Sequence, residues 1–270
     1  MKHPEAKPGP RDLSHVQSVM RALDLLEALS AEPEGLRLSD LARRCGLSVS
    51  TVHRLLTTLQ YRGFVQFDQA QSIWRVGRSA FLVGSAYVQQ RNFVAPALPY
   101  LRSLRDQTRE TANLGVLSEG QVTVLTQVES REIMRAITRV GGQVPVNVSG
   151  MGKAILATYS DADVEAVVAA HGLDSRTRHS KSKLPAFLAD IRATRKRGYA
   201  VDDEEFIPGL RCLAAPVYGP LGEALCAISI SGLSTRLTKE RIEELGGLVV
   251  AMANRLTTEL GGTLPAGQGQ

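Results

Sequence analysis

The sequence predicts an α+β chain with two unlike parts, an N-terminal winged helix-turn-helix domain and a C-terminal domain of helices around a largely antiparallel sheet. Three observations predict it. Two helix-periodic runs meet across a glycine between residues 38 and 63, two short strand-like runs follow at 64–76, and helical and strand-like segments are mixed beyond residue 92. With 270 residues, 43% of them hydrophobic, the chain is long enough for two such cores.

The N-terminal domain is expected over residues 14–77, behind a flexible proline-containing tail at 1–13. Its first helix is predicted over 16–29, where Val19, Leu23 and Leu26 recur about three residues apart. Glu32, Pro33 and Gly35 follow and are expected to end the helix.

Residues 38–63 are typical of a helix-turn-helix. Leu38, Leu41 and Ala42 have helical spacing, the pattern stops at Gly46, and Ser48 stands where the N-cap of a second helix belongs. At 100° per residue, one arc of this second helix gathers its apolar residues: Val49, Val52, Leu55, Leu56 and Leu59. The opposite arc is short and polar: Ser50, Arg54, Thr57 and Thr58, flanked by Thr51.

The charge of this region indicates DNA as a partner. Residues 41–67 contain four arginines and no acid, so the surface could face phosphates without like-charge repulsion. The first 91 residues hold 12 Lys and Arg against 8 Asp and Glu, and so account for most of the net charge of +5. Arginine is expected to reach guanine, and serine or threonine to reach phosphate. The candidate DNA-binding residues are Arg43, Arg44, Ser48, Ser50, Thr51, Arg54, Thr57 and Arg75, the last near the tip of a wing formed by 64–76. The alternative is an ordinary helical hairpin with a solvated basic face.

A connecting helix is predicted over residues 78–91. Phe81, Leu82, Ser85 and Val88 lie along one side of it, an apolar surface that is large for a connector. We therefore expect this helix to pack against another subunit. The alternative is that it docks on its own second domain.

The C-terminal domain is expected over residues 92–262, before a flexible tail at 263–270. Ser160 is predicted to cap a helix, with Asp163 three residues on. The predicted helices are 96–108, 152–159, 161–171, 183–198 and 238–260, and the predicted strands are 111–117, 121–128, 135–140, 211–218 and 224–231.

Several polar residues of this domain are arranged as a ligand pocket would need. The glycines at 150 and 152 open a helix whose unpaired N–H groups could hold a carboxylate. Period-2 alternation places Ser229 and Ser231 on one face of a strand, with Cys212 on the neighbouring strand and Asp202 at the start of an acidic loop. Each has a structural alternative: the serines satisfy backbone groups, the cysteine is a small buried apolar residue, and the aspartate caps a turn.

Four segments carry a family resemblance: Ser-Gly-Met-Gly-Lys-Ala-Ile-Leu-Ala from residue 149, Asp-Asp-Glu-Glu from 202, Gly-Leu-Arg-Cys from 209 and Ala-Ile-Ser-Ile-Ser-Gly from 227. In these segments and their order the chain resembles the IclR family of bacterial transcriptional regulators over about residues 18–261. The resemblance implies a homodimer or homotetramer on a palindromic double-stranded DNA operator, with RNA polymerase as a further candidate partner. It also implies a GAF-like effector-binding and oligomerisation domain whose ligand-binding residues are Gly150, Met151, Asp202, Cys212, Ser229 and Ser231.

The size of these residues predicts the effector. Small donors around a small space suit a short 2-oxo acid such as glyoxylate or pyruvate. Met151 stands where glyoxylate-type members usually carry a small residue, so the pocket is expected to be narrower or reshaped. Aromatic acids are an alternative, although only Phe206 and Tyr218 are aromatic residues near the pocket segments. A DNA-binding adaptor without a small-molecule ligand is another.

Other protein classes are disfavoured by what the sequence lacks. It has no G-x-S-x-G elbow or glycine-rich phosphate loop, and His171 and His179 lie far in sequence from Cys212 and Ser229, so an enzyme is not expected. The three cysteines form no C-x-x-C, and the five histidines share no metal-ligand spacing. No apolar run reaches the roughly 18 residues of a membrane span, and no signal peptide is evident. The sequence thus predicts a cytoplasmic protein without metal or cofactor.

Overall fold

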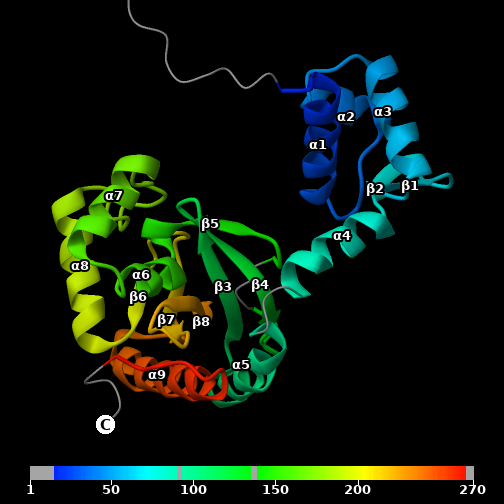
Figure 1. Ribbon diagram of the computed structural model, residues 1–270. Coiled ribbons are helices and arrows are strands. Elements are labelled where there is room, and N and C mark those ends of the chain that lie inside the picture. Colours follow the sequence, from blue (N-terminus) through cyan, green and yellow to red (C-terminus); the bar gives the residue numbers. More distant parts are fainter. Residues whose placement is uncertain (1–14, 90–92, 135–138, 266–270) are drawn as a thin grey trace, which may run out of the picture. The chain divides into compact units, whose positions relative to one another are not determined.

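The computed structural model describes residues 15–89, 93–134 and 139–265 (Figure 1). The chain divides into two compact units, Met1–Gln90 and Arg91–Gln270. Among the described residues, no helix is long and apolar enough to cross a membrane.

The N-terminal unit holds a three-helix domain with a two-stranded wing, followed by a further helix. The domain consists of α1 (Gln17–Ser30), α2 (Leu38–Arg44), α3 (Val49–Tyr61), β1 (Val65–Asp68) and β2 (Ile73–Val76), and the helix after it is α4 (Arg78–Gln89). Fully buried leucines from all three helices, Leu25, Leu41 and Leu56, form its core with Trp74 of the wing. A bridge between Leu36 and Trp74 joins the loop after α1 to the wing. The predicted helix-turn-helix and wing are therefore both present.

The turn between α2 and α3 has the expected local chemistry. Gly46 has a φ of +64°, which favours glycine, and the Ser48 hydroxyl accepts a hydrogen bond from the Thr51 N–H at the start of α3. The predicted apolar arc of α3 is correct for Val52 and Leu56, which are buried, but wrong for Val49, which is 51% exposed. Val49 is the first residue of α3, where the helix has only begun to pack.

The C-terminal unit is built on one antiparallel sheet of six strands, in the order β5-β4-β3-β8-β7-β6. The strands are β3 (Thr111–Ser118), β4 (Gln121–Val128), β5 (Gln143–Pro145), β6 (Ala200–Asp203), β7 (Leu210–Tyr218) and β8 (Ala224–Leu233). Helices α5 (Val94–Thr108) and α9 (Ile242–Glu259) pack on one face of the sheet (Figure 1). On the other face lies α6 (Gly150–Leu156), with α7 (Asp161–His171) and α8 (Leu184–Arg197) outside it.

Alternation along β8 separates the two faces as predicted. Cys226, Ile228 and Ile230 enter the core under α5 and α9, whereas Ala227 enters a second core under α6. Apolar groups thus cover both faces of the sheet. The result is the α+β class that the sequence predicts.

Two predicted segments differ from the structure. Of the strand expected at 135–140, residues 135–138 lie outside the described residues, residues 139 and 140 are not in a strand, and the sheet continues with β5. Asp202 was expected at the start of a loop but lies in β6, a four-residue edge strand paired with β7. Neither segment has enough alternating residues for periodicity to locate it.

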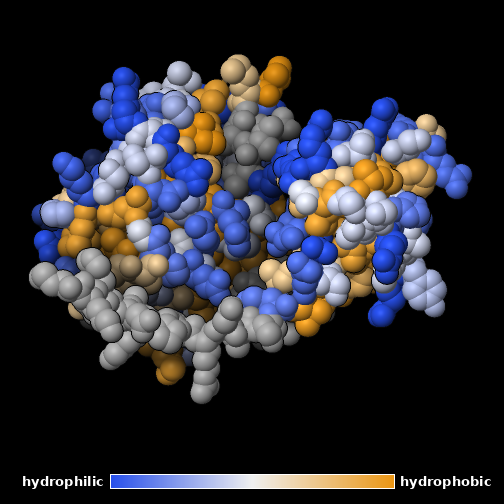
Figure 2. Space-filling model, turned by 90° about the horizontal axis from the view of Figure 1, so that it is seen from above, coloured by the Kyte–Doolittle hydropathy of each residue, from blue (hydrophilic) through white to orange (hydrophobic). Residues whose placement is uncertain are grey.

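Apolar side chains interrupt the polar surface of the N-terminal unit (Figure 2). On α4, Phe81 and Val83 are 71% and 62% exposed, and on α1 Val19 and Leu23 are 54% and 47% exposed. The side chains of Ser85 and Val88 lie outside the described residues, so the predicted apolar side of α4 is seen only in part. Its contact with another subunit stays a prediction.

Candidate functional site

The outer face of α3 presents most of the residues predicted to bind DNA. Ser50, Arg54 and Thr57 are exposed and Thr51 is half-buried. Thr51, Arg54 and Thr57 line a groove of about 620 Å³ together with Ser18 and Arg21 of α1. Arg21 was not among the predicted residues, because it belongs to the helix before the motif.

Two of the predicted arginines have acidic neighbours that lie outside residues 41–67, the interval in which the sequence has no acid. Arg43 pairs with Asp40 at 2.8 Å, and Arg44 pairs with Glu32 at 2.9 Å. The expectation of an acid-free surface is therefore wrong at these positions, since folding brings in carboxylates from outside residues 41–67. Both pairs are exposed, and exposed pairs are worth at most about 1 kcal/mol, so phosphate could replace the carboxylates.

Arg75 was expected near the tip of the wing, and this is wrong. It lies within β2, opposite Gln66, whereas the turn of the wing is formed by residues 69–72. Its guanidinium donates to the Asp68 carboxylate at 3.1 Å and to the Glu34 carbonyl at 3.2 Å. These bonds tie the wing to the loop after α1.

Several hydroxyl groups on α3 are already engaged within the protein. Ser48 caps the helix, and Thr57 donates to the His53 carbonyl at 2.8 Å. Because a hydroxyl has one proton, Thr57 would have to rotate before it could donate to a phosphate. Arg54 makes no ion pair with the described residues, which leaves its guanidinium available to a partner.

Five of the six residues predicted to bind a ligand line a cavity of about 90 Å³ in the C-terminal unit. The structure brings together Gly150 and Met151 at the start of α6, Asp202 in β6, Cys212 in β7 and Ser231 in β8. Strand register explains this, because Asp202 lies opposite Cys212 and Cys212 opposite Ser231 on three neighbouring strands. Phe206, Ile207 and Leu210 add apolar walls.

Ser229 is the one predicted ligand residue that does not line the cavity. It is fully buried and lies opposite Asn113 on β3. The Asn113 side-chain amide donates to the hydroxyls of Ser229 at 3.3 Å and Ser231 at 3.2 Å. Asn113 itself lines the cavity, so it connects Ser229 to the ligand site.

Close packing sets the position of α6 over the sheet. Ser149 caps the helix by accepting from the Gly152 N–H at 3.2 Å. A Cβ atom on Gly150 would lie 2.9 Å from the Cys212 sulfur, so only glycine lets α6 approach β7 this closely. A Cβ on Gly115 of β3 would lie 3.0 Å from the Met151 methyl, so the missing side chain at 115 accommodates the long one at 151.

Asp202 is the principal acidic group of the cavity. Burial raises its pKa to about 7, although the charge of Lys153 and the N–H groups of Glu205 and Phe206 oppose the shift. Those N–H groups donate to one carboxylate oxygen at 2.7 and 3.4 Å. Near neutral pH Asp202 can therefore be protonated and tolerate an anion beside it.

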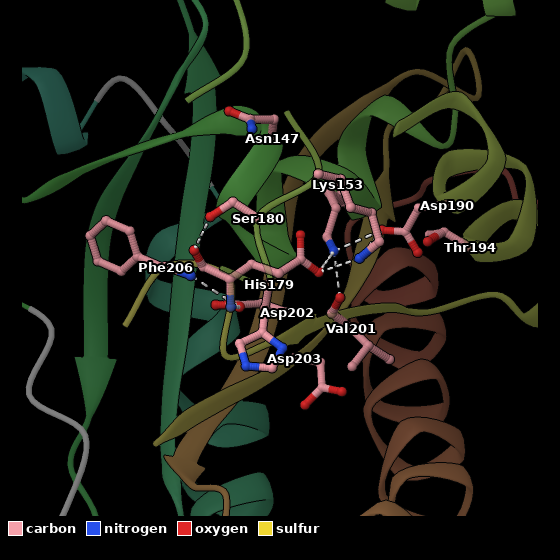
Figure 3. Close-up of polar contacts among 12 residues, drawn as sticks. Asn147, Lys153, His179, Ser180, Asp190, Thr194, Val201, Asp202, Asp203 and Phe206 are labelled. Carbon is pink, nitrogen blue, oxygen red and sulfur yellow. Dashed lines mark hydrogen bonds and ion pairs between the residues drawn. The ribbon is translucent and has the colours of Figure 1, made fainter. Parts of the chain in front are cut away.

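Behind Asp202, a buried lysine holds several segments together (Figure 3). The Lys153 ammonium donates to Asp190 of α8 at 2.8 Å, to the Val201 carbonyl of β6 at 2.5 Å and to Glu205 at 2.6 Å. Burial alone would lower the pKa of Lys153, but the carboxylates of Glu205 and Asp190 outweigh it and raise the pKa above its usual value. Lys153 stays charged and fixes the backbone that holds Asp202.

The chemistry of the cavity suits binding better than catalysis. Burial, followed by the nearby Asp202, raises the pKa of the Cys212 thiol to about 11, so this sulfur is a poor nucleophile at neutral pH. The two histidines of this unit do not line the cavity. The described ranges contain no cluster of metal-ligating side chains.

Sequence reasoning missed Asn113 and Lys153, although each carried a signal. Asn113 is a polar residue in the mostly apolar strand at 111–117, and Lys153 is a charge among small and apolar residues. A polar group in such a setting is usually buried with a specific partner.

Comparison with known proteins identifies a known domain in each of the two units. Residues 18–69 match the IclR helix-turn-helix domain, and residues 85–258 match the C-terminal domain of bacterial IclR transcriptional regulators. The chain is 42% identical over 251 residues to the acetate operon repressor of Salmonella typhimurium, which covers 92% of this chain and 91% of that protein. It is 41% identical over 250 residues to the transcriptional repressor IclR of Escherichia coli K12, again covering 92% of this chain and 91% of the relative.

A solved structure shares the fold. The crystal structure of Thermotoga maritima IclR matches with a TM-score of 0.77 and 25% identity, covering 92% of this chain and 100% of that one. The relatives are named as transcriptional repressors and not as enzymes, as the sequence predicted. With both of its domains matched and two such relatives, the chain belongs to the IclR family of bacterial transcriptional regulators.

Proposed function

We propose that this regulator is a cytoplasmic, homo-oligomeric repressor whose binding to a palindromic operator is controlled by a short 2-oxo acid, such as glyoxylate or pyruvate. Two α3 helices of the oligomer enter successive major grooves, and the acid binds the cavity between α6 and the sheet. Binding in one domain changes DNA affinity in the other through a coupling free energy. Two similar proteins carry the name repressor, one of them for an acetate operon, which supports this proposal.

The cavity is the observation that carries the effector class. Its volume of about 90 Å³ is below the roughly 150 Å³ of a cavity that accommodates benzene. A two- or three-carbon acid fits, whereas an aromatic acid would need the walls to move. Polar groups from Asn113, Cys212, Ser231 and Asp202 give such a small molecule several hydrogen-bonding partners.

The ligand part of the proposal is tested by calorimetric titration of the full-length protein with glyoxylate, pyruvate and a panel of aromatic acids. Saturable binding of a short acid, weakened in Ser231→Ala, is expected. Ser234→Ala, outside the cavity lining, is the control and should bind normally. If only an aromatic acid gives a binding signal, the proposed effector is rejected. If no acid gives a binding signal, an adaptor without a ligand is favoured.

The DNA part is tested with fragments that the purified protein selects from a random pool. If Arg54 reads a base, Arg54→Ala should cost about 1–3 kcal/mol on the selected sequence and much less on random DNA. Equal weakening on both would make Arg54 a phosphate contact. Arg75→Ala is the comparison, because its guanidinium is bonded within the wing; a larger loss there than at Arg54 would contradict the assignment.

A further inference from the structure

The cavity contains a buried hydrogen-bond acceptor that the described protein does not satisfy. Asn113 is 1% exposed, and its Oδ1 atom has no hydrogen-bond partner among the described residues. Its amide nitrogen is used, because it donates to the hydroxyls of Ser229 and Ser231. Buried polar atoms are nearly always paired, so an unpaired one at a ligand cavity indicates what is bound there.

The neighbouring serines do not supply the missing donor. Both hydroxyl oxygens accept from the Asn113 nitrogen, and Oδ1 has no hydrogen-bond partner among the described residues. The amide therefore has its nitrogen toward the serines and its Oδ1 away from them, so a donor for Oδ1 has to come from within the cavity.

A further polar group of the cavity wall is also engaged. Arg211 lines the cavity, but its guanidinium donates to Asp203 at 2.6 Å and to the carbonyls of Ser234 and Leu237. Asp202, whose pKa is about 7, is ionised above that pH and then has no proton to give, so Asn113 Oδ1 receives no hydrogen bond from it there. A water molecule could satisfy Asn113 in the free protein, and a bound ligand that displaces it must present a donor in its place.

We infer that the effector carries a hydroxyl group on the carbon next to its carboxylate, and that this O–H donates to Asn113 Oδ1. This deepens the proposed function and rests on it. Two kinds of acid share this chemistry. One is a 2-hydroxy acid, and the other is a 2-oxo acid whose carbonyl has added water in solution to become a C(OH)₂ group.

The inference ranks the short acids. An aldehyde hydrates far more readily than a ketone, so glyoxylate presents O–H groups in water whereas pyruvate presents mainly a carbonyl oxygen. A carbonyl oxygen is an acceptor and would face another acceptor at Asn113. The site is therefore expected to prefer hydrated glyoxylate and glycolate over pyruvate and acetate, within a cavity that admits all four.

The test is calorimetric titration of the full-length protein with acids that differ by one hydroxyl. Glycolate is compared with acetate and lactate with propionate, and glyoxylate and pyruvate are titrated alongside. Each hydroxy acid is expected to bind at least about tenfold more tightly than its partner, since an unmade buried hydrogen bond corresponds to about 5- to 150-fold in affinity. In Asn113→Leu, which is similar in size but has no acceptor, the ratio within each pair should fall to near one.

The wild-type ratios test the inference even if Asn113→Leu does not fold. Asn113→Asp is the second variant: it keeps an acceptor, so the preference for the hydroxy acid should remain although all anions bind more weakly. Equal binding within the pairs, tighter binding of pyruvate than of glycolate, or a preference that persists in Asn113→Leu would each overturn the inference and leave the proposed function standing. Failure of all six acids to bind would overturn both.

Discussion

Asp202 places a titratable group beside the proposed anion site, so its protonation controls what the site accepts. Its pKa is raised to about 7, hence the group is neutral below pH 7 and negative above it. A negative Asp202 repels a carboxylate ligand, and affinity is expected to fall by up to about tenfold per pH unit above the pKa. Titration with glyoxylate at pH 6, 7 and 8 should show this fall in the wild type and a flat profile in Asp202→Asn. Parallel profiles would assign the pH dependence to another group.

The same shift affects folding stability, with a definite sign. Between its unfolded pKa of 3.8 and its folded pKa of about 7, Asp202 keeps its proton in the native state and loses it in the unfolded state. The free energy of unfolding should therefore fall as pH rises through this window, by at most about 1.4 kcal/mol per pH unit. Denaturant unfolding of the wild type and Asp202→Asn isolates this contribution as the difference between the two curves. A difference that grows in the opposite direction would contradict the assignment.

Gly115 has no side chain, and the long side chain of Met151 occupies the space beside it. In Gly115→Ala, the new methyl group would lie 3.0 Å from the Met151 methyl and 3.1 Å from its sulfur, and would push this flexible side chain into the cavity. Overpacking of this kind costs about 1 kcal/mol or more, so glyoxylate should bind about fivefold or more weakly. Met151→Ala in the same chain should restore the affinity. Calorimetry on both single variants and the double variant measures the coupling between the two residues. If the effects of the two substitutions on glyoxylate affinity simply add, the residues are not coupled.

At the scale of elements, the surface helices α3 and α7 share one capping geometry, and only α3 carries residues predicted to bind DNA. Ser48 caps α3 and Ser160 caps α7, each accepting a backbone N–H at 3.2 Å on the protein surface. Either serine changed to alanine should cost about 1 kcal/mol of stability, measured by chemical denaturation. Only Ser48→Ala should also weaken operator binding in a mobility-shift assay, because it frees the first turn of α3. Equal operator binding by both variants would show that the Ser48 cap does not contribute to DNA recognition.

Helix α4 is the element whose surface we expect to contact another subunit. Phe81 is 71% exposed, an unusual position for a large aromatic side chain unless another surface covers it. We expect Phe81→Ser to reduce the molar mass measured by light scattering. Leu221→Ser is the control, since Leu221 is 93% exposed in the turn between β7 and β8. Unchanged mass in both variants would contradict a role for α4 in the oligomer.

At the scale of the whole molecule, the sequence predicted best where a residue's role is local. The caps at Ser48 and Ser160 and the alternation along β8 follow from neighbouring residues alone, and they were correct. Where distant segments meet, prediction failed. Glu32 reaches Arg44 across 12 positions, and Asn113 meets Ser229 across 116, contacts that no local pattern encodes. Lys153 of α6 likewise meets Asp190 of α8 and the Val201 carbonyl of β6, both far from it in the sequence.

The cavity walls come from all six strands of the sheet and from α6, which together span much of the C-terminal unit. A ligand that binds only when all of these elements are in place must be released when any of them unfolds. Effector binding is thereby linked to the global unfolding of that unit, and at one hundred times its Kd the ligand adds about 2.7 kcal/mol to the stability. Differential scanning calorimetry should show this as a rise in the Tm of the C-terminal unit that scales with effector concentration. A regulator built this way is most resistant to heat and proteolysis when its metabolite is abundant. Its lifetime in the cell is therefore expected to rise with the concentration of that metabolite.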